Sequence, residues 1–256
     1  IYNQLSEHHV YNIIEEDQGM YVEGGFYKGY NHKFNFWLHY NNKITTNAEL
    51  SFPLQKKYSY LRIGSQYRYD TRDIYIDPNS GIFFDIEFNH SFGFYDTDDM
   101  FDIELDFNIY KSFFSYLESV FKYNFFSNIQ YSKSDLPIFK KHYIGGSDYV
   151  RGYSAIPSNN AIPNSTEKIE VDNFIINSIE IQSTMINRKE YFKQVEMGID
   201  FVLFADYGIG YNLNQPINWD NVLCGYGLGF KIFLMGAVIK FDYALNMHGT
   251  SNWHLF

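Results

Sequence analysis

The chain has 256 residues with 24 Tyr and 25 Phe and a formal net charge of −10, yet its mean hydropathy is −0.33. The acidic balance argues against a general nucleic-acid binder, which needs a basic surface. The single Cys224 excludes an internal disulfide and a cysteine metal cluster. Aromatic residues are interleaved with Asp, Glu, Asn, Lys and Ser along most of the chain. This composition favours a sheet with one apolar face and one polar face.

Uninterrupted apolar stretches are short in this sequence. A membrane-spanning helix needs roughly 20 apolar residues, and the longest run, Ile232 to Ile239, is less than half that length and contains Gly236. No signal peptide is visible, so we expect the chain to start at a mature or trimmed N-terminus. If the chain spans a membrane it must form a closed barrel, because lipid tolerates only helices and sheets without edges.

Apolar and polar residues alternate with a period of two along most of the chain, which predicts β-strands. The clearest runs are 82–94, 101–110 and 195–208. Each has about ten residues or more, the length that a tilted strand needs to cross the hydrocarbon layer. With the weaker runs included, the alternation predicts about twelve strands, which in chain order are 20–30, 33–41, 47–53, 58–70, 82–94, 101–110, 116–126, 174–184, 195–208, 223–235, 237–246 and 252–256.

These strands predict an all-β fold, a transmembrane antiparallel up-and-down β-barrel that forms a single domain over residues 1–256. The connections alternate between short and long, as in barrels with tight periplasmic turns and longer outer loops. The longest connection covers about 128–172, and we expect it to fold into the lumen. A soluble β-sandwich is the alternative, but its strands usually have about five or six residues.

The alternation also assigns the two faces of each strand. Tyr and Phe gather near the strand ends on the apolar face, as in the aromatic girdles at the two membrane interfaces. We predict that the residues facing lipid include Phe84, Phe88, Leu105, Ile199, Phe201 and Leu203. We predict that the residues facing the lumen include Glu87, Asp106, Glu196 and Asp200.

Four motifs narrow the family. In the long loop, Gly145-Gly146 is followed by Val150-Arg151-Gly152-Tyr153. The other three are Phe204-Ala205-Asp206-Tyr207-Gly208, Glu180 between Ile179 and Ile181, and Tyr69-Asp70-Thr71-Arg72-Asp73 followed by Pro78 and Gly81. In their chain order and spacing, the four motifs make residues 59–256 resemble the bacterial surface antigen family, the barrel of the outer-membrane assembly factor and two-partner secretion transporter superfamily. In that resemblance the last motif is a periplasmic hairpin, and we assign no chemistry to its polar turn.

Arg151 is the candidate anchor of the long loop. A period of two places Phe204, Asp206 and Gly208 on the polar face of their strand, and Glu180 lies on the polar face of its own. An arginine that folds back into the lumen would meet both carboxylates in a partly dehydrated space and form charge-assisted, bidentate pairs.

The residues around Arg151 have expected roles of their own. Gly152 lets the backbone pass close to the wall, and Gly208 leaves space for it. Tyr153 is expected to stack on, or hydrogen-bond with, inward aromatics such as Phe204. The alternative is that Arg151 is an exposed loop arginine without a partner.

A search for catalytic or metal-binding groups gives no positive case. The Gly-x-Ser-x-Gly motif is absent, and no serine motif accompanies His39 or His90. The His8-His9 pair is more typical of a solvated segment than of a metal site. The Asp98-Asp99 pair supplies too few ligands for calcium. We therefore predict no enzyme activity, no catalytic residue, no metal and no cofactor.

The resemblance implies a multi-pass protein of the Gram-negative outer membrane that assists insertion of polypeptides into this membrane or their translocation across it. It also implies barrels of about sixteen strands preceded by periplasmic transport domains. We therefore expect such a domain, and further strands, upstream of Ile1, unless this is a shortened member. The expected partners are outer-membrane lipids and a polypeptide substrate or fused passenger, with no nucleic acid. The alternatives are the translocator barrel of a fused patatin-like autotransporter and a passive solute channel.

Overall fold

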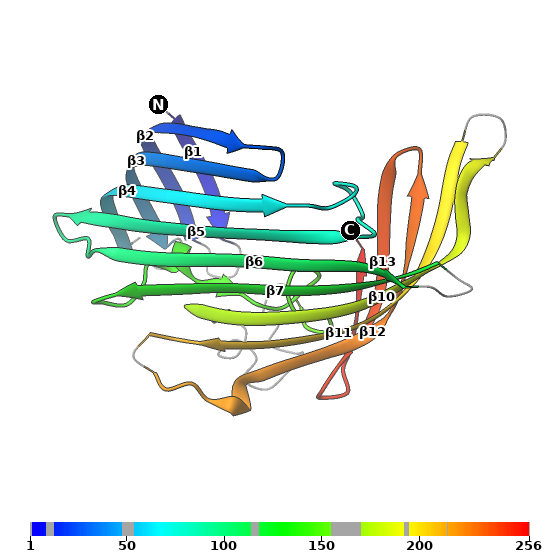
Figure 1. Cartoon of the computed structure of the whole chain (residues 1–256). Helices are drawn as coiled ribbons and strands as arrows, with labels where there is room; N and C mark the ends of the chain where they lie inside the picture. The colour runs from blue at the N-terminus through cyan, green and yellow to red at the C-terminus, as the bar shows by residue number, and fades with distance from the viewer. Residues whose placement is uncertain are drawn as a thin grey trace. The chain divides into compact units, whose positions relative to one another are not determined.

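The computed structural model describes residues 2–8, 13–47, 54–113, 118–154, 170–191, 195–213 and 215–255. Nearly all regular structure in these ranges is β-strand (Figure 1). No helix among them is long and apolar enough to cross a membrane. The elements are β1 (Tyr2–His8), β2 (Ile13–Lys28), β3 (His32–Asn47), β4 (Leu54–Asp70), β5 (Gly81–Phe94), β6 (Met100–Phe113), β7 (Ser119–Ser132), η1 (Ile138–Lys140), β8 (His142–Tyr143), β9 (Glu170–Val171), β10 (Asn173–Tyr191), β11 (Val195–Tyr211), η2 (Trp219–Asn221), β12 (Val222–Leu234), β13 (Ala237–Asn246) and β14 (Ser251–Leu255).

Twelve of the strands form one sheet in the order β1-β2-β3-β4-β5-β6-β7-β10-β11-β12-β13-β14, and β8 pairs with β9 in a small second sheet. Sequence neighbours are therefore sheet neighbours, except that β10 follows β7. The described pairings are antiparallel. The predicted all-β, up-and-down antiparallel arrangement is confirmed.

Two elements differ from the sequence predictions, and one predicted strand lies outside the described residues. The strand β1 was not predicted, because its residues do not alternate clearly. The strand predicted at 47–53 falls outside the described residues, apart from Asn47, which belongs to β3. The long connection predicted at about 128–172 begins later, because β7 continues to Ser132.

The described chain divides into two compact units. The first unit comprises residues 1–69, 85–105 and 128–139, and the second comprises 70–84, 106–127 and 140–256. In the first unit β2 and β3 pair without interruption from Lys28↔His32 to Ile13↔Asn47, and β4 continues alongside β3 (blue to cyan in Figure 1).

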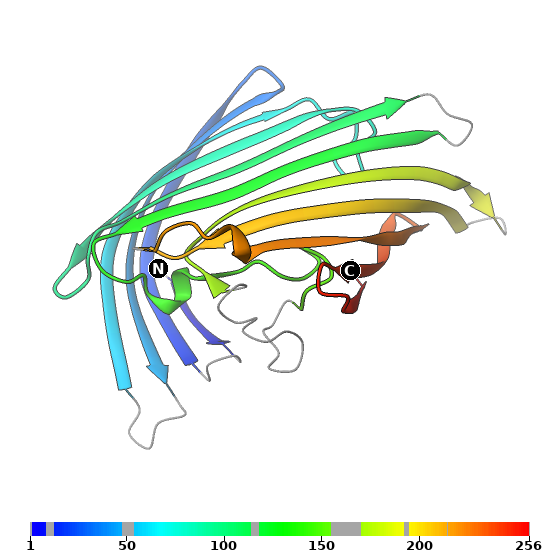
Figure 2. The same cartoon turned by 90° about the horizontal axis from the view of Figure 1, so that it is seen from below.

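In the second unit, β10 to β14 follow one another as neighbouring strands. The pairing of β10 with β11 is regular from Asn173 to Thr184 and then shifts register twice before Lys189. Figure 2 shows the green chain of about 140–154 lying along one side of the yellow and orange strands β10 to β12. That side is the polar face of these strands, and we call it the second wall.

The two faces of the sheet differ as the alternation predicts. Phe88 and Leu203, both predicted to face lipid, are 40% and 47% exposed to the surroundings. On the opposite face, Asn89 and Asp200 are buried by neighbouring polar side chains. Exposure therefore alternates between the two faces as predicted at Phe88, Leu203 and Asp200, and the chemistry-bearing side chains lie on one side of each unit.

Candidate functional site

The loop that carries Arg151 stands on an apolar base. Val150 and Tyr153 are buried with Ile144 at the start of the loop, and the Val150 N–H donates to the Ile144 carbonyl at 3.1 Å. The base also includes Val171, Phe174, Ile176 and Leu223 from β9, β10 and β12. Burial of these side chains is favourable and holds the backbone on either side of Arg151 against the second wall.

Arg151 forms a bidentate ion pair with Asp206 on β11. Its Nε and Nη2 each donate to one Asp206 carboxylate oxygen at 2.7 Å, and its backbone N–H donates to the same carboxylate at 3.0 Å. The Ser178 hydroxyl donates to Asp206 at 2.6 Å. The guanidinium and the carboxylate are both planar, so this parallel geometry fixes orientation as well as charge.

Two further carboxylates complete the pocket around Arg151. Its Nη1 donates to Glu180 at 2.6 Å and to Asp242 at 3.0 Å. The guanidinium carbon lies 3.5 Å from the centre of the Phe204 ring, which places a cation on the face of an aromatic ring. The structure thus brings Arg151 together with Glu180, Phe204 and Asp206. The fourth predicted wall position, Gly208, lies against the neighbouring Val150.

The environment of Arg151 is dry and negatively charged. The Arg151 side chain is 4% exposed, and those of Asp206 and Asp242 are fully buried. Burial alone would lower the pKa of Arg151. The hydrogen bonds with Asp206 and the charges of Glu180, Asp206 and Asp242 outweigh burial, so the pKa lies above its usual value. The arginine therefore stays charged, and it is the counter-ion that allows the carboxylates to be buried there.

Two glycines allow the loop to approach the wall. Gly152 has φ of +92°, a conformation that other residues adopt at a cost, and a Cβ there would lie 2.9 Å from the Leu245 carbonyl. A Cβ on Gly208 would lie 2.6 Å from Val150. Both glycines therefore match the close approach that we inferred for them from the sequence.

The last two strands also hold the loop, which the sequence reasoning missed. The Gly152 carbonyl accepts hydrogen bonds from Asn246 on β13 at 2.9 Å and Asn252 on β14 at 2.8 Å. The Gly152 N–H donates to Nε2 of His254 at 3.2 Å. Asp242 was missed as well. Asp242 and Asn246 alternate with apolar residues on β13, so a period of two could have placed them on the polar face.

The expectation for Tyr153 was wrong. Its ring does not stack on Phe204, because the Arg151 guanidinium occupies that ring face. The Tyr153 hydroxyl instead bonds the backbone of β12, accepting from Cys224 N at 3.3 Å and lying 3.4 Å from Cys224 O. Tyr153 thus fastens the loop to a strand backbone.

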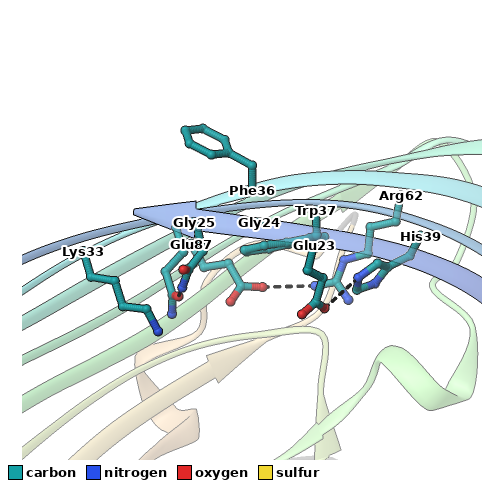
Figure 3. Close-up of a pocket in the computed structure, with 11 residues that line it drawn as sticks. Glu23, Gly24, Gly25, Lys33, Phe36, Trp37, His39, Arg62 and Glu87 are labelled. Atoms are coloured by element: carbon teal, nitrogen blue, oxygen red, sulfur yellow. Dashed lines mark hydrogen bonds and ion pairs between the residues drawn. The ribbon is translucent and has the colours of Figure 1, made fainter. Parts of the chain in front are cut away.

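Among the described residues, no loop arginine docks on the polar wall of the first unit, although Phe139 of η1 lies over Lys43 there. This wall holds a pocket of about 490 Å³ lined by side chains of β2, β3, β4 and β5 (Figure 3). Glu23 contacts His39 at 2.9 Å, and Arg62 Nη2 contacts Glu87 at 3.1 Å. Figure 3 shows Phe36 on the other side of the strands, away from these groups.

Metal binding has little support in the described ranges. They contain no group of three or more His, Cys, Asp or Glu side chains arranged to hold a metal ion.

Comparisons with solved structures show the fold. The crystal structure of BamA from Haemophilus ducreyi lacking POTRA domains 1–3 matches with a TM-score of 0.75 at 13% identity, and the match covers 99% of this chain and 57% of that one. CdiB from Acinetobacter baumannii gives a TM-score of 0.61 at 16% identity, covering 95% of this chain and 42% of that one. The likeness extends over nearly the whole chain, so it shows an outer-membrane β-barrel fold.

Sequence comparisons agree. The outer membrane protein assembly factor BamA of Nitratidesulfovibrio vulgaris is 28% identical over 95 residues, which are 37% of this chain and 11% of that protein. The chain therefore spans only part of the length of its relatives. A profile of the Omp85 superfamily domain matches residues 24–254. The chain belongs to the Omp85 superfamily and is a β-barrel protein of the Gram-negative outer membrane.

Proposed function

We propose that this barrel assists the insertion of polypeptides into the outer membrane or their passage across it, without enzymatic chemistry. The observation that carries the proposal is the Arg151 loop, seated on the second wall against Asp206, Glu180 and Asp242 in a chain of this superfamily. A passive solute channel does not need a loop anchored by a buried ion pair. The name of the Nitratidesulfovibrio relative, an assembly factor, supports the same class.

The proposal includes partners outside this chain. The expected substrate is an unfolded polypeptide, and the expected neighbour is a periplasmic transport domain in the same, longer protein. The chain covers only 57% of the Haemophilus chain, which lacks POTRA domains 1–3. This partial coverage supports a larger protein in which the barrel is one part.

The test uses the full-length protein in liposomes and a urea-unfolded outer-membrane polypeptide as the substrate. We expect the protein to accelerate protease-resistant insertion or uptake over empty liposomes, and Arg151→Ala to remove most of that acceleration. Arg68→Met is the matched control, because Arg68 pairs with Asp85 at 2.6 Å on the wall of the first unit without anchoring a loop. Free passage of small sugars without acceleration of the polypeptide would favour the solute channel and overturn the proposal.

A further inference from the structure

A second loop is anchored on the second wall by a buried acid. This loop joins β4 to β5 over residues 71–80, and its Asp77 has φ of +57° and a side chain that is 4% exposed. Three cations surround the Asp77 carboxylate. They are Lys122 on β7 with Nζ at 2.6 Å, Lys231 on β12 with Nζ at 2.8 Å, and Arg188 on β10 with Nη2 at 2.8 Å.

The 71–80 loop is tied together internally, so the position of Asp77 fixes the rest of the loop. Arg72 forms a bidentate pair with Asp70 at 2.9 and 2.7 Å. One Asp73 oxygen accepts three backbone N–H groups, from Ile74, Asn79 and Ser80. Thr71 and Asp73 also donate backbone hydrogen bonds across the base of the loop. These bonds hold the 71–80 loop in one conformation around Asp77.

The two anchors on the second wall have opposite signs. Arg151 places one cation among three carboxylates, whereas Asp77 places one carboxylate among three cations. Each anchor comes from a loop, and each takes its partners from several strands. A buried charge left without its partners is costly, so each loop remains on the wall as long as its ion pairs persist.

Glu180 lies between the two anchors. It accepts hydrogen bonds from Arg151 at 2.6 Å and from Lys240 at 3.1 Å, and it also lies in the field of Lys231. Lys231 contacts Asp77 at 2.8 Å. In the pairing of β12 with β13 it stands directly opposite Lys240, the cation that contacts Glu180, and the charges of Lys231 and Glu180 also interact. Gln182 adds a direct link, because its Oε1 accepts from Lys231 at 2.7 Å and its Nε2 donates to Asp77 at 3.1 Å.

We propose that Asp77 holds the 71–80 loop on the second wall, as Arg151 holds its own loop. We call each anchored loop a latch, and we propose that the two latches are coupled through Lys231 and Glu180. When Asp77 is neutral or absent, Lys231 loses its nearest anion and draws Glu180 away from Arg151. Release of one loop therefore weakens the hold on the other. The inference goes beyond the proposed function, because it concerns the folded barrel alone and is tested without a polypeptide substrate.

Limited trypsin digestion of the full-length protein, read by mass spectrometry, reports each latch separately. Cleavage after Arg151 requires its buried side chain to leave the wall, and cleavage after Arg72 requires the 71–80 loop to open. We expect Asp77→Asn to accelerate cleavage after Arg151 at least about fivefold, the lower end of typical coupling between sites. Asp85→Asn is the matched control: it neutralises an acid on the first wall, and cleavage after Arg151 should not change.

A second variant tests the route of the coupling. Adding Lys231→Met to Asp77→Asn removes the cation that competes for Glu180, so cleavage after Arg151 should return towards the wild-type rate. When cleavage is slow compared with reclosing, its rate follows the equilibrium population of the open loop. In that regime the coupling is reciprocal, so Arg151→Ala should accelerate cleavage after Arg72 by a similar factor. Asp77→Glu keeps the charge but displaces it, and covers the case in which the neutral variant does not fold.

Three results would overturn the proposal. The first is an Asp77 variant whose Arg151 cleavage matches that of the Asp85→Asn control. The second is a double variant with Lys231→Met that stays as open as Asp77→Asn alone. The third is an Arg151→Ala protein in which cleavage after Arg72 is unchanged. None of these readouts depends on transport, so they fail independently of the proposed function.

Discussion

On the wall of the first unit, Arg62 and Arg68 pair with carboxylates of the neighbouring strand β5, and their side chains are 28% and 31% exposed. On the second wall, Arg151 arrives from a loop, contacts carboxylates of three strands and is 4% exposed. The residue type and the sheet are the same, but the solvent exposure of the arginine side chains differs. A partly exposed arginine–carboxylate pair contributes little to holding neighbouring strands together. Breaking a buried pair leaves an uncompensated charge, so a buried pair holds the loop in one place.

The largest effect should come from Arg151. Arg151→Ala leaves Asp206 and Asp242 buried without their cation, so we expect the free energy of unfolding to fall by about 3–5 kcal/mol. Asp206→Ala should cost a similar amount, and the double variant should cost little more, because the two groups act as one unit. Urea titrations in lipid vesicles measure all three. Strictly additive losses would show that the pair is not coupled.

Arg151→Lys sharpens the same point. An ammonium group keeps the charge but cannot present a planar fork to Asp206 and Glu180 at once. We expect a stability between wild type and Arg151→Ala in the same titration. Full recovery would mean that charge alone, and not the bidentate geometry, holds the loop.

Arginine substitutions on the lipid-facing side should cost a similar free energy in the two units. Phe88→Arg in the first unit and Leu203→Arg in the second each place a cation on the lipid side, at an expected cost of about 2–4 kcal/mol near the bilayer midplane. Unfolding titrations in vesicles of the same lipid compare them directly. A much smaller cost at one position would show that this side chain does not face the hydrocarbon layer.

Acid should weaken the Asp77 latch. Burial alone would raise the pKa of Asp77. The charges of Lys231 and Lys122 and their hydrogen bonds outweigh burial, so the pKa lies well below its usual value. Its contribution to stability is therefore complete at neutral pH and declines as the pH falls below about 4, the unfolded pKa of aspartate. The difference in unfolding free energy between wild type and Asp77→Asn should stay constant from neutral pH to that point and then shrink. A difference that already shrinks between pH 7 and 5 would contradict the lowered pKa.

The smallest effect should come from Arg62. Its partner Glu87 is 27% exposed and can be rehydrated when the arginine is removed. We expect Arg62→Met to cost about 1 kcal/mol or less, measured as for Arg151→Ala. A loss as large as that of Arg151 would erase the distinction between the two walls.

Much of the fold could be predicted from the sequence, because the period-two alternation depends only on nearest neighbours along the strand. The polar face of β11, with Phe204, Asp206 and Gly208, follows from that period alone. The loop motif then suggested which cation meets these residues, and the structure brings Arg151 to them.

Partners set by strand register could not be predicted in the same way. Asp242 on β13 contacts Arg151, although it lies two strands from Asp206 on β11. Its place beside Arg151 depends on the register of two successive strand pairings, and the alternation pattern does not give that register. Tyr153 was misplaced because competition between two side chains for the Phe204 ring depends on packing. The turn from Asp70 to Asp73 was assigned no chemistry, and Asp77 after it was missed, because its partners come from strands that lie far along the chain.

The Arg151 loop contacts five consecutive strands, from Glu180 on β10 to His254 on β14. Side chains alternate along a strand, so a slip of one residue in any of these pairings would turn an acid such as Asp206 to the lipid side. The guanidinium would then find an aromatic or aliphatic side chain where a carboxylate should be. The docked loop therefore fits only one register of these five strands, although a shifted sheet could form as many backbone hydrogen bonds.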